Sequence, residues 1–271
     1  MEKRKPLILI ANDDGYHSGG LRQLVSFIED LGEIVVCAPD SPRSGFSCAF
    51  SAEPPLYLHR RKDIFSAKVW SCSGTPVDCV KIAMDQLLDG RLPDVVIGGI
   101  NHGDNSTVNN HYSGTMGVAI EGCLKYIPSI AFSSCDYNPD ADLSALRDYV
   151  RKILLHVLDK GLPKGVCLNV NFPSNAPFKG VKVCRMGYGR WINEVVACKH
   201  PRGKDYYWMV GKYIDDEPGA TDNDRWALNN GYVCITPTTV DVTAYEVMEE
   251  MKVLEVPSNL PLEGEALIIG S

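Results

Sequence analysis

Apolar residues in the first two-thirds of the chain alternate between short continuous runs and helical spacing. Residues 7–11 are wholly apolar, and in residues 21–31 Leu, Val and Ile recur at a helical period that stops before Gly32. Similar signals predict strands at 34–38, 94–98 and 166–170, and helices at 76–88, 113–125 and 143–158. Because apolar strands alternating with helices are typical of a parallel sheet covered on both faces, we expect an α/β fold with a doubly wound, mostly parallel sheet.

The pattern changes near residue 180. Aromatic segments with interspersed glycines, at 186–191 and 206–213, are typical of hairpins, and residues 232–236 can return to the sheet. We therefore expect residues 1–180 to form a core that binds metal and phosphate. Residues 181–271 are expected to supply a hairpin extension, a returning strand and an oligomerisation segment, within one domain overall.

The C-terminal region is expected to leave the body of its own subunit. A short helix is predicted around Tyr245 and Met251, and the tail after it carries Pro257 and ends in the apolar run 266–269. Since an apolar terminus needs cover, we expect this tail to dock on a neighbouring subunit.

Composition excludes several classes of protein. Of the 271 residues, 45% are hydrophobic and 23% charged, which is typical of an ordinary folded protein rather than a disordered one. The net charge of −7 disfavours a nucleic-acid polymer as partner, because such binding needs a basic surface. No apolar run approaches the length of a membrane span, so no membrane partner is expected either.

The cysteines and the start of the chain favour a cytoplasmic location. The ten cysteines are scattered without a C-x-x-C pair, and most lie in apolar runs, which is typical of reduced core residues. The apolar stretch before Asn12 is too short for a signal-peptide core.

The strongest chemical signal is the sequence Asn-Asp-Asp-Gly at residues 12–15, directly after the first predicted strand. Ligands of open parallel sheets bind outside the carboxyl ends of the strands, so Asp13 and Asp14 fall at the right edge. Both carboxylates can reach one ion only if the backbone turns between them, which Gly15 makes sterically easy. The alternative is that these aspartates only cap a helix or form a turn.

Two further strand-end loops offer neutral oxygen ligands, namely Ser44 and the side chain of Asn101. Hard cations such as Mg²⁺ typically take one or two carboxylates and leave other positions for water and substrate phosphate. Two carboxylates with neutral oxygens balance a dication without repelling a phosphate dianion. The set Asp13, Asp14, Ser44 and Asn101 therefore favours phosphate chemistry.

Ser113, Gly114 and Thr115 open the predicted helix that follows Asn101 in the chain. Backbone amides at a helix start, next to small residues that allow close approach, are suited to binding phosphate. Ser113 is equally well explained as a helix N-cap.

These residues belong to a longer set of motifs that resembles the SurE family of survival-protein 5′-nucleotidases. The matching residues run in order over nearly the whole chain: 12–15, 38–40 and 43–45, 74–76 and 78–79, 99–101 with 103 and 105, 112–115, 201–203, and 231–233 with 235–237. The resemblance implies a Rossmann-like domain with a β-hairpin extension and a C-terminal segment exchanged between subunits of a homodimer or homotetramer.

The resemblance also implies a function and a site. It implies one divalent metal ion per subunit, Mg²⁺ or Mn²⁺, held by the four ligands named above, and it adds Asn105 to Ser113, Gly114 and Thr115 as residues that bind phosphate. The implied reaction is hydrolysis of nucleoside 5′-monophosphates, with 3′-monophosphates or other small phosphate esters as further substrates.

We expect direct attack by a water that the metal activates, with Asp13 and Asp14 as catalytic residues and Asp13 orienting or deprotonating the water. His17, His102 and His111 are candidates for protonating the leaving group. The alternative is a non-catalytic sensor of nucleotides or phosphate on the same fold. A dehydrogenase or P-loop enzyme is disfavoured because neither G-x-G-x-x-G nor G-x-x-x-x-G-K-[ST] occurs.

Trp208 lies in an aromatic segment that follows a basic stretch at 199–204. It is interpreted either as a surface that stacks on a nucleobase or, more simply, as strand packing or a subunit contact.

Overall fold

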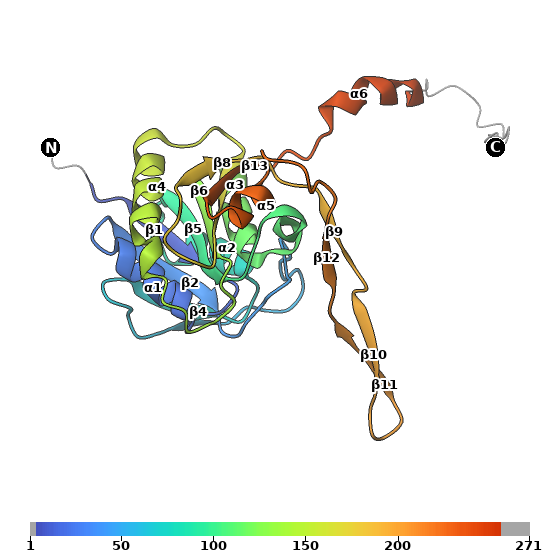
Figure 1. Ribbon diagram of the computed structural model, residues 1–271. Coiled ribbons are helices and arrows are strands. Elements are labelled where there is room, and N and C mark those ends of the chain that lie inside the picture. The colour runs from blue at the N-terminus through green and yellow to red at the C-terminus, as the bar shows by residue number, and fades with distance from the viewer. Residues whose placement is uncertain (1–3, 256–271) are drawn as a thin grey trace, which may run out of the picture. The chain divides into compact units, whose positions relative to one another are not determined.

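A nine-stranded sheet organises residues 4–240 of the computed structural model, which describes residues 4–255 (Figure 1). In chain order its strands are β1 (Leu7–Ala11), β2 (Glu33–Pro39), β3 (Leu58–Arg60), β4 (Lys68–Cys72), β5 (Val95–His102), β6 (Ser129–Ser134), β7 (Val166–Phe172), β8 (Val181–Val183) and β13 (Val233–Thr239). Their order across the sheet is β3-β4-β2-β1-β5-β6-β7-β13-β8. The predicted α/β fold with a mostly parallel sheet is confirmed, since only the β3–β4 and β7–β13 pairs are antiparallel.

The sheet reverses its winding direction at β1. From β1 the chain proceeds to β2 and β4 on one side, and β5, β6 and β7 follow on the other. In the parallel register Ile8 of β1 faces Ile34 of β2 and Val95 of β5. Loops diverge on the two sides of such a reversal and leave a crevice at the carboxyl ends of the strands. The loops after β1 and β5 flank this crevice.

Helices cover both faces of the sheet, as the continuously apolar strands predict. They are α1 (Gly19–Ile28), α2 (Pro76–Gln86), α3 (Gly114–Leu124) and α4 (Arg147–Lys160), with 3₁₀ turns η1 (Thr107–Tyr112) and η2 (Ser144–Leu146) and the short α5 (Asp224–Asn229). Ile8 and Ile10 pack with α1 and α4, whereas Leu7 and Leu9 pack with α2 and α3. The alternation of side chains along β1 thus serves two cores.

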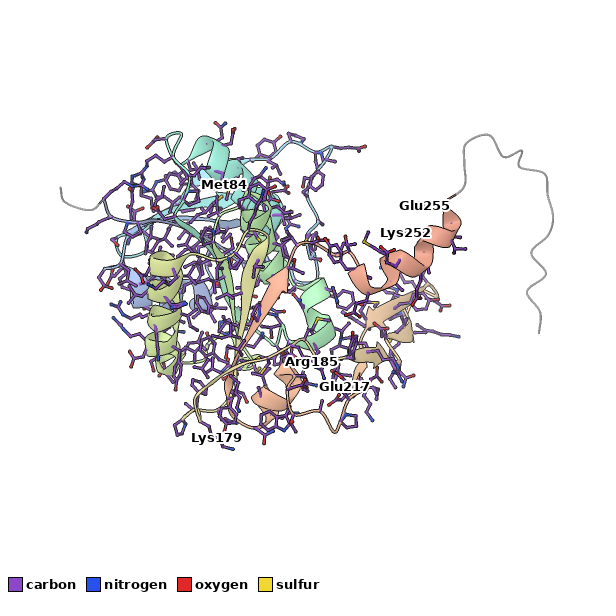
Figure 2. All side chains as sticks on the ribbon, turned by 90° about the horizontal axis from the view of Figure 1, so that it is seen from above. Met84, Lys179, Arg185, Glu217, Lys252 and Glu255 are labelled. Atoms are coloured by element: carbon purple, nitrogen blue, oxygen red, sulfur yellow. The ribbon has the colours of Figure 1, made fainter. Side chains whose placement is uncertain are left out.

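A two-part antiparallel ribbon, here called the arm, projects from the sheet (Figure 1). It is formed by the part of the chain that lies between β8 and β13 in the sequence. It pairs β9 (Gly189–Ile192) with β12 (Lys212–Asp215) and β10 (Val195–Lys199) with β11 (Asp205–Met209). At its base Arg185 forms ion pairs with Glu217 at 2.8 Å and Asp222 at 2.9 Å (Figure 2). The hairpins predicted at 186–191 and 206–213 are confirmed.

Residues 241–255 belong to a separate unit of the chain. It contains α6 (Tyr245–Met251), the predicted short helix, and the 3₁₀ turn η3 (Lys252–Leu254). The predicted docking of the tail at 266–269 lies outside the described residues.

The other predicted elements of the core are confirmed, with ends shifted by a few residues, and 232–236 does return to the sheet in β13. Strands β3, β4, β6 and β8 are not predicted by the sequence pattern. β6 is buried at all six positions although three of them are serine, so it lacks the apolar run that marks the other central strands.

All ten cysteines are free, and seven of them are buried. Among residues 4–255, no helix combines the length and apolar character that a membrane span requires.

Candidate functional site

The turn after β1 is built by the side chain of Asn12, which is fully buried. Its amide nitrogen donates to the carbonyl of Gly15 at 3.0 Å and to the hydroxyl of Ser18 at 2.8 Å, and its oxygen accepts from the Gly15 amide at 3.1 Å. Gly15 has φ +96°, a conformation that favours glycine. The chain therefore turns at Gly15, after the two aspartates and before α1.

Asp13 is held against the start of α3. The hydroxyl of Thr115 donates to its Oδ1, and the carboxylate residue is only 4% exposed. A Cβ on Gly114 would lie 2.8 Å from the Cβ of Asp13, so only glycine permits this approach. Burial raises the pKa of Asp13 to about 6, with the charge of Asp14 adding to the rise and the Thr115 hydrogen bond opposing it. A carboxylate held this way gains from a neighbouring cation.

The side chain of Asp14 reaches the end of the neighbouring strand β5, at the residue after Asn101. Its Oδ2 accepts from the backbone amide of His102 at 3.4 Å, and burial raises its pKa despite that contact. The Asn101 amide nitrogen donates to the carbonyl of Gly103 at 2.9 Å, which leaves the side-chain oxygen available as an acceptor. The structure thus brings the ends of β1 and β5 together on the two sides of the winding reversal.

The Ser44 loop approaches the same place through its main chain. The amide of Arg43 donates to the carbonyl of Asp13 at 2.7 Å, and the hydroxyl of Ser47 donates to the carbonyl of His111 at 2.6 Å. Ser44 therefore follows a residue bonded directly to Asp13, but its own side chain is exposed. The side chain of Ser44 is therefore less restrained than that of Asp13.

At the start of α3, the Ser113 hydroxyl accepts from the Met116 amide at 3.0 Å, so Ser113 is the N-cap. The amides of Gly114 and Thr115 come before any intrahelical carbonyl partner, as in the first turn of every α-helix. These two amides lie beside Asp13 and are free to bind an anion.

Asn105 belongs to a buried polar network rather than to the open part of the site. Its amide nitrogen donates to the hydroxyl of Ser133 at 2.8 Å, and its backbone amide donates to Asn171 Oδ1 at 2.9 Å. The carbonyl of Asn105 accepts from Asn169. The contacts of this residue fix the loop after β5.

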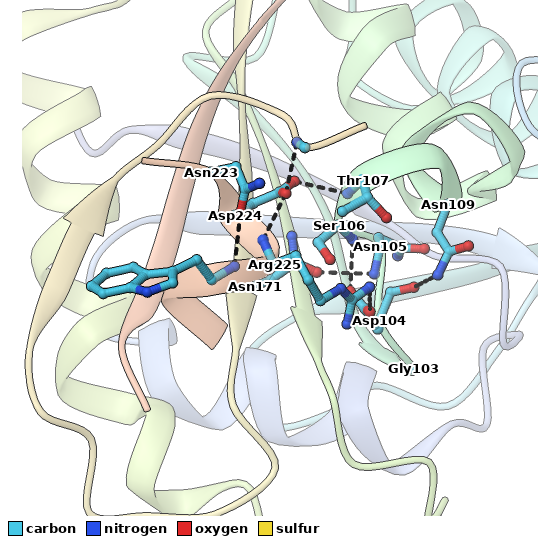
Figure 3. Close-up of polar contacts among 12 residues, drawn as sticks. Gly103, Asp104, Asn105, Ser106, Thr107, Asn109, Asn171, Asn223, Asp224 and Arg225 are labelled. Carbon is cyan, nitrogen blue, oxygen red and sulfur yellow. Dashed lines mark hydrogen bonds and ion pairs between the residues drawn. The ribbon is translucent and has the colours of Figure 1, made fainter. Parts of the chain in front are cut away.

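Figure 3 shows a second set of contacts that holds the same loop, centred on Asp224 at the start of α5. Asp224 is fully buried, and its carboxylate accepts from the amides of Thr107 at 2.8 Å, Gly187 at 2.9 Å and Arg225 at 2.8 Å. Arg225 also forms an ion pair with the largely buried Asp104. The loop after β5 is thereby joined to the base of the arm.

Sequence reasoning missed this second set of contacts. Asp104 and Arg225 are 121 positions apart, and neither belongs to a motif with local spacing. The one local signal is Asn223, whose side chain accepts from the Trp226 amide and caps α5. It predicts a helix start but not the burial of the neighbouring Asp224.

A pocket of about 470 Å³ opens beside Asp14 and is lined by Tyr16, His17, His102 and Tyr137, among others. Burial lowers the pKa of His102, and the charges of Asp136 and Asp140 and a contact with the Asp136 backbone oppose the shift. The pocket is large enough for a small organic phosphate. His111 lies instead on η1, where its carbonyl anchors Ser47.

The donor chemistry fits a hard divalent cation. Nowhere in residues 4–255 do three His, Cys, Asp or Glu side chains gather in a way suited to a metal. A cation here would be held by Asp13, Asp14 and the neutral oxygens of Asn101 and Ser44. Such a set, with few carboxylates, is typical of Mg²⁺ sites that also bind phosphate.

Comparisons with known proteins identify the family of this chain. The model of the family described as "Survival protein SurE" matches residues 8–193. A protein of Bacteroides fragilis named 5′-nucleotidase SurE is 54% identical over 252 residues, covering 93% of this chain and 98% of its own. A protein of the same name from Cytophaga hutchinsonii is 47% identical over 250 residues, covering 91% and 96%.

A solved structure has the same fold. The crystal structure of the SurE protein from Aquifex aeolicus superposes with a TM-score of 0.78 at 36% identity and covers 92% of this chain and 99% of that one. The resemblance carried by the motifs is therefore confirmed, and the chain belongs to the SurE family.

Proposed function

We propose that this protein is a divalent-metal-dependent 5′-nucleotidase that hydrolyses nucleoside monophosphates to nucleoside and phosphate. The observation that carries the proposal is the convergence of Asp13, Asp14 and Asn101 at the winding reversal of the sheet, next to the free amides at the start of α3. The 5′-nucleotidase names of relatives up to 54% identical support the reaction class.

Different residues of the protein have different roles in this reaction. Asp13 and Asp14 supply the negative charge that binds a cation, and Asn101 and Ser44 supply neutral oxygens. The amides of Gly114 and Thr115 hold the phosphate and stabilise charge on its oxygens. A divalent cation held by these residues would supply Lewis acidity, which would activate water and offset the negative charge of the phosphoryl group.

Asp13 is assigned to orient or deprotonate the attacking water. Its carboxylate is held in one orientation by the hydroxyl of Thr115 and by the close approach of Gly114. His17 and His102 line the pocket beside Asp14 and are the two candidates for protonating the leaving oxygen. His111 is a weaker candidate because its ring is not among that lining.

The test is release of inorganic phosphate from a panel of nucleoside 5′- and 3′-monophosphates with Mg²⁺ or Mn²⁺, compared with a chelator control. We expect turnover that requires the metal and prefers 5′-monophosphates. Saturable nucleotide binding without turnover under all of these conditions would favour the sensor instead.

We further propose that the protein works as a homodimer or homotetramer. The arm exposes Val195, Tyr207, Trp208 and Met209, and a two-stranded ribbon is marginally stable without cover. Sedimentation of the wild type and of Tyr207→Ser/Trp208→Ser should show an oligomer that the double variant weakens. A wild type that stays monomeric at micromolar concentration would contradict this.

A further inference from the structure

A second pocket, of about 410 Å³, adjoins the one beside Asp14. Tyr16, His17 and Ser18, in the loop between β1 and α1, line both of them. The second pocket is completed by Arg22 of α1 and by residues 61–64, which follow β3. We call it the arginine pocket.

Arg61 is held in place within this pocket. Its Nε donates to the hydroxyl of Ser71 at 2.8 Å, and Ser71 is fully buried on β4. The guanidinium carbon lies 4.7 Å from the centroid of the Tyr16 ring, two positions after Asp14. The terminal guanidinium nitrogens have no hydrogen-bond or ion-pair partner in the described part of the chain. A fixed guanidinium with free donors is preorganised to bind an anion.

The other cations of the arginine pocket are also unpaired. Arg22 lies 5.1 Å over the ring of Phe65, and neither it nor Lys62 forms an ion pair with any described residue. The one carboxylate that lines the pocket, Asp63, is already bonded to Arg60. Three cations therefore face the pocket without a carboxylate of their own, in a chain whose net charge is −7.

The chemistry of these groups selects a phosphate. Guanidinium groups match the oxygens of phosphate with two parallel hydrogen bonds, and an ammonium adds charge without demanding a geometry. A site of this kind raises the local concentration of anions even on an acidic protein. Since one short segment lines both pockets, an anion in the arginine pocket lies next to a phosphate bound beside Asp14.

We propose that the arginine pocket binds a second phosphate group carried by the substrate itself, as in a nucleoside 3′,5′-bisphosphate. This inference rests on the proposed nucleotidase activity, because that activity places the phosphate to be cleaved beside Asp14. The enzyme would accordingly prefer nucleotides with two separate phosphates to simple monophosphates.

The test measures binding without turnover. Adenosine 3′,5′-bisphosphate, adenosine 5′-monophosphate and inorganic phosphate are titrated by calorimetry, in EDTA, into the wild type and into Arg22→Gln/Arg61→Gln. We expect the wild type to bind the bisphosphate at least about tenfold more tightly than the monophosphate, and the double variant to lose that preference. The matched control is Arg147→Gln, which removes an exposed arginine that lies over Phe27 and is absent from this pocket.

Several results would overturn the proposal. One is an unchanged bisphosphate preference in the double variant, with a thermal midpoint near that of the wild type showing that it is folded. Another is an equal loss for bisphosphate and monophosphate, which indicates a general field effect. Binding of inorganic phosphate that needs both arginines, without any bisphosphate preference, would assign the pocket to a free anion instead.

A kinetic measurement separates this inference from the function on which it rests. With Mn²⁺ present, the ratio of kcat/KM for bisphosphate over monophosphate should fall about tenfold or more in the double variant and stay constant in Arg147→Gln. If the wild type releases no phosphate from any nucleotide, the proposed function fails, and the calorimetric ratio still decides whether the pocket binds a second phosphate.

Discussion

The two sides of the candidate metal site differ in burial and in how many contacts hold the candidate ligand. On one side Asp13 is 4% exposed, accepts a hydrogen bond from Thr115 and lies against Gly114. On the other side Ser44 is exposed, in a loop fixed through the main chain of Arg43 and the hydroxyl of Ser47. The charged candidate ligand Asp13 is thus fixed by the fold itself, whereas Ser44, one of the two neutral candidates, lies exposed in a loop.

This difference has a thermodynamic consequence. Burying two neighbouring carboxylates costs free energy that a bound cation offsets, and the raised pKa values of Asp13 and Asp14 are the sign of that cost. An exposed serine carries no such cost. Changes on the aspartate side should therefore have large effects on activity and stability, and changes on the serine side small ones.

The largest effect is expected from Asp13→Asn. The variant keeps the size of the side chain and a partner for Thr115 but loses the negative charge, so phosphate release should fall by about 10³-fold or more. The measurement is kcat/KM with Mn²⁺, together with a circular dichroism spectrum to verify folding. Turnover within tenfold of the wild type would remove Asp13 from the chemistry.

Asp224→Ala tests how the loop after β5 is supported. The change leaves three backbone amides without their buried acceptor, so the free energy of unfolding should fall by about 3 kcal/mol in a urea titration. The control is Asp222→Ala, whose exposed carboxylate pairs with Arg185 and should contribute much less to stability than the buried Asp224. Similar losses for both variants would show that burial of Asp224 does not matter.

The pH dependence of stability should expose the cost of burying Asp13. Its pKa is about 6 in the folded protein against an ordinary 3.8, so the folded state binds this proton more tightly than the unfolded state. The tighter proton binding contributes at most about 3 kcal/mol to the free energy of unfolding. This contribution is fully present below pH 3.8 and is lost as the pH rises through about 6.

Comparison with Asp13→Asn isolates that contribution, because the asparagine does not titrate. In EDTA, the variant should be more stable than the wild type at pH 8, and this advantage should shrink toward pH 4.5. Thermal midpoints measured at both pH values decide the matter. An advantage that does not change with pH would mean that Asp13 has an ordinary pKa.

The smallest effect is expected from Ser44→Ala. Water can replace an exposed hydroxyl among the ligands of a cation, so kcat/KM should fall by about tenfold or less and the free energy of unfolding should change by under about 0.5 kcal/mol. Activity assays over a range of Mn²⁺ concentrations would show a weakened metal requirement. A loss as large as that of Asp13→Asn would mean that both sides of the site are equally critical.

Much of the fold follows from local sequence pattern. The run Leu7–Ala11 predicts β1 because a strand covered on both faces must be apolar throughout, and Gly15 predicts the turn that follows. β6 escapes this rule because its serines are satisfied by buried polar partners, such as Asn105 with Ser133. Asn105 is 28 positions from Ser133, and so distant a partner leaves no local pattern, whereas Ser129 and Ser134 bond to residues only two positions away.

The residues of the candidate site also differ in how far local sequence predicts them. The sequence places the aspartates just after β1 and Asn101 near the carboxyl end of β5, and parallel strands bring their carboxyl ends to one edge. The supports of the site could not be predicted, because the Asp104–Arg225 ion pair and the burial of Asp224 depend on where α5 packs. Only the assembled fold shows that Gly114 must lack a side chain for Asp13 to fit.

The most direct test of the site is a titration with Mn²⁺ followed by electron paramagnetic resonance of the free ion. We expect the wild type to bind one Mn²⁺ per subunit, Asp14→Asn to bind it at least about tenfold more weakly, and the exposed control Asp85→Asn to match the wild type. Absence of saturable binding to the wild type, or equal affinity in Asp14→Asn, would contradict a cation held between the ends of β1 and β5.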